Sequence, residues 1–574
     1  MFVNQATAVG ALVTGAASSL QLSESVVAAT KDDGTDKGYG VHAVKGAKLV
    51  MSDVRVDGNR VVGVGAVGAN TSVDLLRVHV GATSIGNFSK TMFGNGLYAD
   101  DGAQVSASGL RIVGNTSHGV FANKPSTLMN LRGIILAGTQ ATPDGVGGKG
   151  VQAQLGATIR LTAARISANH TDGVFTIDSS TLIDIHGGVI DGTLPQPSDN
   201  KFGHGAGSNY GAKRNLRAVR ISGNVEAGVH SGQNGQVDAS GVLVDATSSS
   251  AANGTQGVGI AIEFASSLKL VAARLSGNRF AGLRVMHAGS KVKLRDVLVD
   301  GTLGRGLDGA FGVGILAALG PKVHLNGVRL SANHVCGAFA TGTGTVIDGS
   351  GLLIDSTTVT AGALMLTSVF SVDGPDVRLT GARIVNNPSG GIYAVGPNAS
   401  RLTVHGLDFI GKPSDFGPFD VGVQVDGGVA RVEVVGSRIR HAQSAAASFG
   451  DSVGALRDSV IIDTLEGEHI MYDNELNPIG KSVKLSDGIV VGLWAQVEVA
   501  NTVIFGQARA GVLAKGGQAT LKSTLIGGGY LGTALVGSGK LIESGLLFFD
   551  NQSNHSRDNG LYVPKAPSPV PPQL

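Results

Sequence analysis

The chain has 574 residues, with 45 Lys and Arg against 43 Asp and Glu, so its formal net charge is only +2. This balance, without any basic run, gives no electrostatic case for a nucleic-acid partner or an anionic membrane surface. Gly is abundant at 88 residues, but it does not recur at every third position, and 42% of the residues are hydrophobic. Collagen is therefore excluded and disorder is disfavoured.

The first 22 residues, MFVNQATAVGALVTGAASSLQL, contain no Lys or Arg. They lack the positive region of a secretory signal peptide, and no 18-residue apolar run in the chain predicts a membrane span. The stretch GALVTGAASSLQLSESVVAAT, from Gly10, resembles a repeat already under way. The sequence therefore predicts a fragment or a mis-started reading frame, with any export signal upstream of Met1.

An Arg recurs along most of the chain at steps of 54 to 56 residues, and an Asn follows four residues after seven of the eight. Such a fixed period is typical of a stacked solenoid. The two series are Arg55, Arg111, Arg165, Arg220, Arg274, Arg329, Arg383 and Arg438, and Asn59, Asn115, Asn169, Asn224, Asn278, Asn333 and Asn387.

Each repeat contains two related half-units, for example GVQAQLGATIRLTAARISANHT from Gly150 and GVFTIDSSTLIDIHGGVIDGT from Gly173. Short alternating Val, Ile and Leu runs, broken by Gly, Asn, Asp or Ser, predict short strands joined by tight turns. A half-unit of this length suits one turn of a β-solenoid. We predict an all-β, single-stranded, right-handed parallel β-helix of about 20 turns over residues 1–563. A Pro-rich tail over 564–574 follows, since Pro cannot donate to a ladder.

Insertions of variable length follow alternate half-units, always at the same phase. They begin after Thr193, Thr247, Thr302, Gly411 and Thr464. A shared phase predicts loops that project from one edge of the solenoid on every second turn. Loops on a rigid scaffold commonly carry function, so this row is the first place to expect a binding surface.

The segments VRLSANHVCGAF, LRIVGNTSHGVF and ARIVNNPSGGIYAV resemble the repeat of the pectate-lyase-like, right-handed parallel β-helix superfamily. The doubled unit also resembles large bacterial surface proteins built of this repeat. The resemblance implies the fold, but it spans lyases, hydrolases, epimerases, tailspikes and adhesins, so it assigns no activity. It also implies a location outside the cytoplasm, extracellular or on the cell surface. Cys336, within VCGAFA, is expected in the core.

The Arg series admits two interpretations. Arg165, Arg220, Arg274, Arg329 and Arg383 could bind an acidic polysaccharide through repeated bidentate contacts. However, an Asp recurs 25 or 26 residues after five members of the series, which predicts a structural Arg–Asp ladder and is the interpretation we favour. Those residues are Asp191, Asp245, Asp300, Asp355 and Asp463. The Asn series predicts turns with left-handed backbone, hydrogen-bonded locally or to the next turn.

Two related loop segments, DGTLPQPSDNKFGHG and DGTLGRGLDGAFGVG, carry Asp199 and Asp308 at the same place. Carboxylates so placed could help to bind Ca²⁺, which takes six to eight oxygen ligands. No EF-hand-like run accompanies them, and Asp and Gly are common turn formers, so we favour a turn role and expect no obligatory cofactor.

For catalysis, the GHG motif at His204 matches one motif of polygalacturonases, but the companion Asp and Arg/Lys motifs are absent. The longest insertion breaks the repeat and is rich in titratable groups, so Glu466, Glu468 and His469 are further candidates. No unique cluster emerges. The leading hypothesis is a non-enzymatic surface or secreted β-helix whose loops mediate adhesion or bind glycan or matrix. The alternatives are a polysaccharide lyase or epimerase and a structural spacer.

Overall fold

The computed structural model describes the whole chain except residues 36, 87–93, 359–366, 389, 397–400, 413–420, 429–430, 473–477 and 558–574. The side chains of 467–472 and 478–485 also lie outside the description. The described residues form short strands and no helix, and hence none that could cross a membrane. The fold is a right-handed parallel β-helix, as the repeat predicts.

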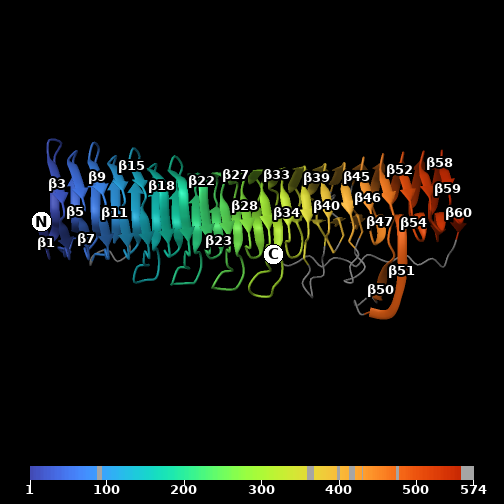
Figure 1. The fold of residues 1–574 in the computed structure, drawn as a ribbon, viewed down its shortest axis with the longest axis horizontal. Helices are drawn as coiled ribbons and strands as arrows, with labels where there is room; N and C mark the ends of the chain where they lie inside the picture. The colour runs from blue at the N-terminus through green and yellow to red at the C-terminus, as the bar shows by residue number, and fades with distance from the viewer. Residues whose placement is uncertain are drawn as a thin grey trace. The chain divides into compact units, whose positions relative to one another are not determined.

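The chain divides into two compact units. Unit 1 comprises Met1–Arg284, Ser290–Val292 and Arg305–Asp308, and unit 2 comprises Val285–Gly289, Lys293–Gly304 and Gly309–Leu574. Both are built from turns of the same design, in which each strand pairs in parallel with its counterpart one turn later (Figure 1).

Each turn contributes one strand to each of three faces. In one turn these are β11 (Asn95–Asp100) on face 1, β12 (Gln104–Ser108) on face 2 and β13 (Arg111–Val113) on face 3. The next turn supplies β14 (His118–Asn123), β15 (Leu128–Arg132) and β16 (Ile135–Ala137). The registers Leu97↔Val120, Val105↔Met129 and Ile112↔Leu136 continue the half-unit period through all three faces.

Three later turns join faces 2 and 3 in one ten-residue strand. These strands are β18 (Thr158–Ser167), β20 (Leu182–Asp191) and β22 (Lys213–Ser222). Face 1 of the same turns consists of β17 (Lys149–Gln154), β19 (Asp172–Ile177), β21 (His204–Asn209) and β23 (Ala227–Ser231). Unit 2 repeats the pattern, with β32 (Val313–Ala318), β35 (Ala338–Thr341) and β38 (Val369–Val372) on face 1.

The core consists of the inward side chain of every second strand residue, mainly Val, Ile, Leu and Ala. Val120, Val151 and Val174 are fully buried at one register of face 1. Cys336 is buried as expected. Arg214 is an exception, because it occupies a core position beside Ile183 and is 0% exposed. Its Nη2 donates to Thr176 Oγ1 at 2.8 Å, and burial lowers the pKa of Arg214 to about 9.

The Asn series has a structural role, but a different one from that expected. Asn169 and Asn224 are fully buried, and each Oδ1 accepts from a backbone N–H one turn back, that of Thr139 or Thr193, at 3.0 Å. The left-handed residue is the one before the Asn, such as Ala168 with φ 51°. The amide therefore satisfies a buried donor of the neighbouring turn, while its predecessor bends the backbone.

Long loops leave the corner between faces 3 and 1 on alternate turns of unit 1, as predicted. They span 138–148, 192–203 and 246–257, whereas the intervening corners need only 168–171 and 223–226 (Figure 1, cyan to green). Neighbouring loops touch, since Ser198 N donates to the Gly145 carbonyl at 3.1 Å. The longest insertion forms an antiparallel hairpin of β50 (Gly467–Tyr472) with β51 (Pro478–Val491).

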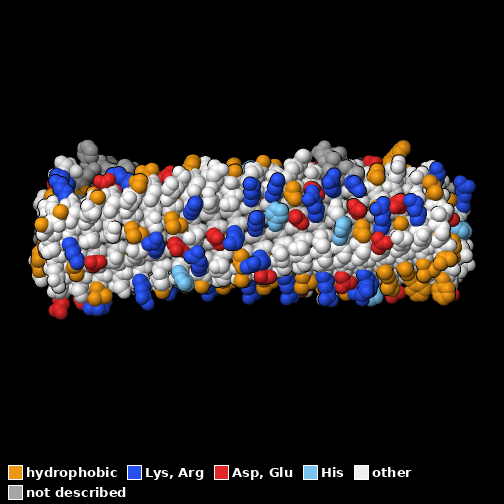
Figure 2. Space-filling model, turned by 90° about the horizontal axis from the view of Figure 1, so that it is seen from above, with side chains coloured by type: hydrophobic (Ala, Val, Ile, Leu, Met, Phe, Trp, Pro, Cys, Tyr) orange, Lys and Arg blue, Asp and Glu red, His pale blue; other side chains and the backbone are white. Residues whose placement is uncertain are grey.

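Exposed apolar side chains concentrate over the last turns of unit 2 (Figure 2). Phe505, Leu525, Leu547 and Phe549 are all more than one-third exposed. They lie on face 3, on β53 (Val503–Phe505), β56 (Leu525–Gly527) and β59 (Leu547–Phe549). The Arg and Asp of earlier turns are replaced by apolar residues here.

Candidate functional site

Arginine and aspartate side chains from successive turns pair across face 3. Nη2 of Arg220 lies 2.8 Å from Oδ2 of Asp245, and Nη2 of Arg165 lies 3.3 Å from Oδ2 of Asp191. The remaining predicted pair confirmed within one unit is that of Arg329 with Asp355, bidentate at 3.1 and 2.6 Å.

One predicted pair differs, and one pair was missed. The Asp463 carboxylate lies 3.9 Å from His441 Nε2, rather than pairing with Arg438 as the offset suggested. Arg383 instead finds Asp408, with its Nε 3.5 Å from Oδ2. We call the four pairs of Arg165, Arg220, Arg329 and Arg383 with Asp191, Asp245, Asp355 and Asp408 the Arg–Asp rungs.

In every rung the arginine is more exposed than its partner. The side chains of Arg165, Arg220 and Arg329 are 63%, 54% and 52% exposed, whereas their aspartates are 30%, 19% and 12% exposed. Arg383 and Asp408 follow the same order at 61% and 34%. The recessed carboxylates orient the guanidinium groups, so the charge presented to solvent at each rung is mainly positive.

The rungs stand at the base of the loops. Asp191 is the last residue of β20, and Asp245 is the last residue of β25 (Leu243–Asp245), directly before the loops 192–203 and 246–257. In unit 2, Arg329 starts β34 (Arg329–Ser331) and Arg383 starts β40 (Arg383–Val385). We call the rungs together with the adjoining loops the binding edge.

His204 forms a charged cluster on the outer side of face 1. Its Nδ1 lies 3.3 Å from Asp172 Oδ1 and its Nε2 lies 3.7 Å from Glu226 Oε2. Asp172 and His204 are register partners at the start of β19 and β21, and Glu226 directly precedes β23. The ring of His230 stacks on His204, with centroids 4.8 Å apart.

Burial alone would lower the pKa of His204, but hydrogen bonds and charges from Asp172 and Glu226 raise it to about 9. The imidazole is therefore protonated near neutral pH and cannot accept a proton there. Glu226 also accepts from Ser250 Oγ at 2.6 Å, which fastens the loop 246–257 to face 1. A catalytic role for His204 stays a prediction, whereas its three-turn bridging contacts are evident.

The two loop aspartates stand on separate loops. Asp199 Oδ1 accepts from the backbone N–H of Lys201 at 3.0 Å, and Asp308 accepts from Nε and Nη2 of Arg305 at 2.7 and 2.6 Å. Among the described residues, no group of three His, Cys, Asp or Glu side chains could hold a metal ion. Calcium binding by Asp199 or Asp308 remains a prediction.

The catalytic candidates of the longest insertion belong to unit 2. Glu466 is exposed directly before β50. The hairpin places Glu468 opposite Lys484 and His469 opposite Val483 in β51. The side chains of Glu468 and His469 lie outside the described residues, so their catalytic role stays a prediction.

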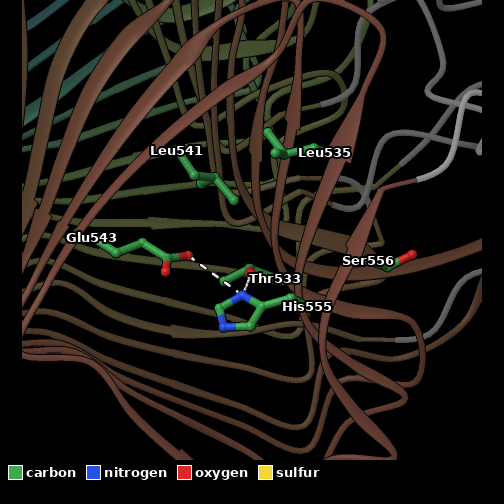
Figure 3. Close-up of a pocket in the computed structure, with 6 residues that line it drawn as sticks. All are labelled: Thr533, Leu535, Leu541, Glu543, His555 and Ser556. Carbon is green, nitrogen blue, oxygen red and sulfur yellow. Dashed lines mark hydrogen bonds and ion pairs between the residues drawn. The ribbon is translucent and has the colours of Figure 1, made fainter.

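A cavity of about 320 Å³ lies among the last described strands of unit 2 (Figure 3). Its lining includes Thr533, Glu543 and His555, and His555 Nδ1 lies 2.9 Å from Thr533 Oγ1 and 3.6 Å from Glu543 Oε1. Glu543 is in register with Leu521, and His555 with Thr533, both buried in the preceding turn. The cavity is thus a polar end of the core rather than a cleft on an outer face.

No protein-family model matches this chain, and no curated protein matches it. Among solved structures, the chain is similar to the Vag8–C1 inhibitor complex, with 12% identity over 96% of this chain and 100% of that chain and a TM-score of 0.27. The PL6 family alginate lyase AlyGC gives 9% identity, coverage of 89% and 97%, and a TM-score of 0.25. PfbA, a surface adhesin of Streptococcus pneumoniae, gives 8% identity, coverage of 89% and 85%, and a TM-score of 0.12. These likenesses provide no basis for assigning an activity.

Proposed function

We propose that this chain is a non-catalytic β-helix that acts outside the cytoplasm, on the cell surface or in secreted form, and binds an acidic polysaccharide along the binding edge. The observation that supports the proposal is the exposure order of the Arg–Asp rungs, with outward guanidinium groups over recessed carboxylates. A repeated display of this kind suits a ligand that is itself periodic.

The chemistry of the rungs fits carboxylate or sulfate groups. A guanidinium carries five N–H donors in a planar fork, and a bidentate contact such as that of Arg220 with Asp245 uses only two. The remaining donors can bind an anionic group of a sugar chain, and the adjoining loops can adapt to its substituents. Exposed pairs of charges contribute only about 0.2–1 kcal/mol each, so affinity would come from several rungs together.

The test compares two quadruple variants. In the first, Arg165, Arg220, Arg329 and Arg383 are replaced by Gln. In the matched control, Arg77, Arg217, Arg378 and Arg431 are replaced by Gln. These four are 59%, 51%, 50% and 66% exposed, are also paired with carboxylates, and are likewise divided two to each unit, but lie off the rungs. Binding to alginate, polygalacturonate and heparin is measured by surface plasmon resonance at two salt concentrations.

We expect the rung variant to bind roughly 10- to 100-fold more weakly than wild type, and the control to stay within about threefold. Equal loss in both variants would show nonspecific charge attraction and overturn the proposal. Absence of binding to every acidic polymer would favour the spacer hypothesis. Release of shortened or unsaturated sugars from the polymer would favour the lyase or epimerase hypothesis, with the His204 cluster and Glu466 as the first sites to mutate.

A further inference from the structure

A second surface, of different chemistry, lies on the outer side of face 1 in unit 1. The rings of Tyr98 and Phe121 come from register-paired positions of β11 and β14, with centroids 5.7 Å apart. His118 stacks on Phe121 at 4.8 Å with an interplanar angle of 15°. All three side chains are partly exposed, so the rings offer apolar faces that the core does not use.

A chain of planar polar groups borders these rings. Gln152 donates to Gln154 at 2.7 Å, Gln154 donates to Asn123 at 3.2 Å, and Asn123 donates to Asp100 at 3.2 Å. The phenol of Tyr98 donates to the same carboxylate at 2.7 Å. Every bond in this chain points toward Asp100, so the groups fix and polarise one another.

We call Tyr98, Phe121, His118, Asp100, Asn123, Gln152 and Gln154 the aromatic–amide patch. Three strands, β11, β14 and β17, hold it at fixed register, with Phe121 opposite Gln152 and Asn123 opposite Gln154. A surface carried on strands is more rigid than one carried on loops, so its groups are already positioned before any ligand arrives.

The patch differs from the binding edge in charge. Burial, with a smaller effect from the charge of Lys149, lowers the pKa of His118 to about 3, so this ring is neutral at any physiological pH. Asp100 is the one carboxylate of the patch, and the ammonium of Lys124 lies 3.5 Å from it. An anionic or cationic ligand would find no unbalanced charge here.

The aromatic row continues beyond the patch in the direction of the N-terminus. Gly65, in β8 (Val62–Val67), is the register partner of Tyr98 and presents no side chain. The rings of Tyr39 and His42, from β5 (Gly38–Val44), stack at 4.2 Å, and His42 leans over Gly65. Flat rings therefore flank a low step, a shape into which a flat ligand ring can fit.

We propose that the aromatic–amide patch binds a neutral pyranose ring of a polysaccharide. Such a ring has an apolar C–H face, which packs on aromatic faces, and a rim of hydroxyl groups that both donate and accept. The amides match that rim, because each has two N–H donors and a carbonyl acceptor and the observed chain uses one N–H of each. This site is independent of the Arg–Asp rungs and goes beyond the proposed function.

The test uses the full chain and neutral polymers only. Mixed-linkage β-glucan, xylan, galactomannan and starch are each included in native gels, and dissociation constants are obtained from retardation. Phe121→Ala, Phe121→Leu and Asn123→Ala probe the rings and the amide chain. The matched controls are Tyr210→Ala and Gln236→Ala, because Tyr210 is 54% exposed in the turn after β21 and Gln236 is an exposed residue at the start of β24 (Gln236–Ser240).

At least one neutral polymer should retard the wild type. Phe121→Ala, Phe121→Leu and Asn123→Ala should each weaken that binding roughly 3- to 10-fold, and the controls less than twofold. Thermal unfolding midpoints, measured in parallel, separate lost contacts from lost folding, and Phe121→Leu keeps an apolar side chain in place. High salt and the rung variant should leave this binding unchanged.

Three outcomes overturn the inference. These are retardation by no neutral polymer, equal retardation of wild type and patch variants, and loss of neutral-polymer binding in the rung variant. Acidic-polymer binding is scored separately in all variants. The inference can therefore fail while the proposed function stands, and the proposed function can fail while the inference stands.

Discussion

At the scale of single residues, His204 shows how two opposing effects decide a protonation state. Its side chain is only 11% exposed, and burial favours the neutral imidazole. Asp172 and Glu226 outweigh that effect, since a buried carboxylate without a cation costs more than a buried ion cluster. The cluster joins strands of three turns and one loop, so its charge state bears on how firmly that loop is held.

The raised pKa makes stability depend on pH. The contribution of protonated His204 is fully present below the unfolded pKa of about 6.5 and is lost as pH rises through about 9. We expect wild type to lose about 3 kcal/mol more stability between pH 7 and pH 10 than His204→Gln does. Urea unfolding at both pH values measures this difference.

The exposed His186 supplies the control, because His186→Gln should reproduce the wild-type pH dependence. Unfolding curves of wild type and His204→Gln that change in parallel between pH 7 and pH 10 would show that His204 does not carry a stabilising proton.

At the scale of strands and turns, the sequence predicts the pieces with one local cause. The alternation in TIRLTAARIS predicts the strand β18, and the phase of the insertions predicts loops at one corner. The fixed offset from Arg220 to Asp245 predicts a contact because both residues lie at register positions one turn apart. Regular stacking converts sequence distance into spatial distance wherever loop length stays constant.

Prediction fails where that conversion depends on a loop of unknown length. Asp172 and His204 are register partners, but the insertion between them hides this in the sequence. Arg383 contacts Asp408, which is its direct register partner rather than the residue two positions on, as in the other rungs. The aromatic–amide patch was missed for another reason, because Tyr98, Phe121 and Gln152 share a column but no common residue type.

The glycine that ends each insertion is required by close backbone contact. Gly203 has φ 96°, and a Cβ there would lie 2.7 Å from Val225 Cβ in the next turn. Gly148, Gly257 and Gly312 meet the same obstacle. We expect Gly203→Ala to cost at least about 2 kcal/mol, because the added carbon clashes in addition to straining the backbone.

Gly223 is the matched control, since it also has positive φ, 63°, but no atom lies within 4 Å of the position that a Cβ would take there. Gly223→Ala should cost only about 1 kcal/mol, from backbone strain alone. Chemical denaturation of both variants gives the comparison, and an equal loss in the two would contradict the steric explanation.

At the scale of the whole molecule, the proposed binding energy is distributed over rungs that repeat in both units. A distributed site responds to mutation differently from an active site, because no single contact carries the reaction or most of the affinity. The rungs are also far enough apart in sequence to be altered one at a time, which makes this difference measurable.

We therefore expect graded loss of binding as Arg165, Arg220, Arg329 and Arg383 are replaced by Gln in succession. Each step should weaken binding to the acidic polymer by roughly 1.5- to 5-fold, as expected of an exposed ion contact of about 0.2–1 kcal/mol. The logarithm of Kd, from surface plasmon resonance, should rise nearly linearly with the number of rungs removed, because separate rungs share no partner. A single substitution that abolishes binding, followed by no further change, would instead locate one dominant site and contradict a distributed edge.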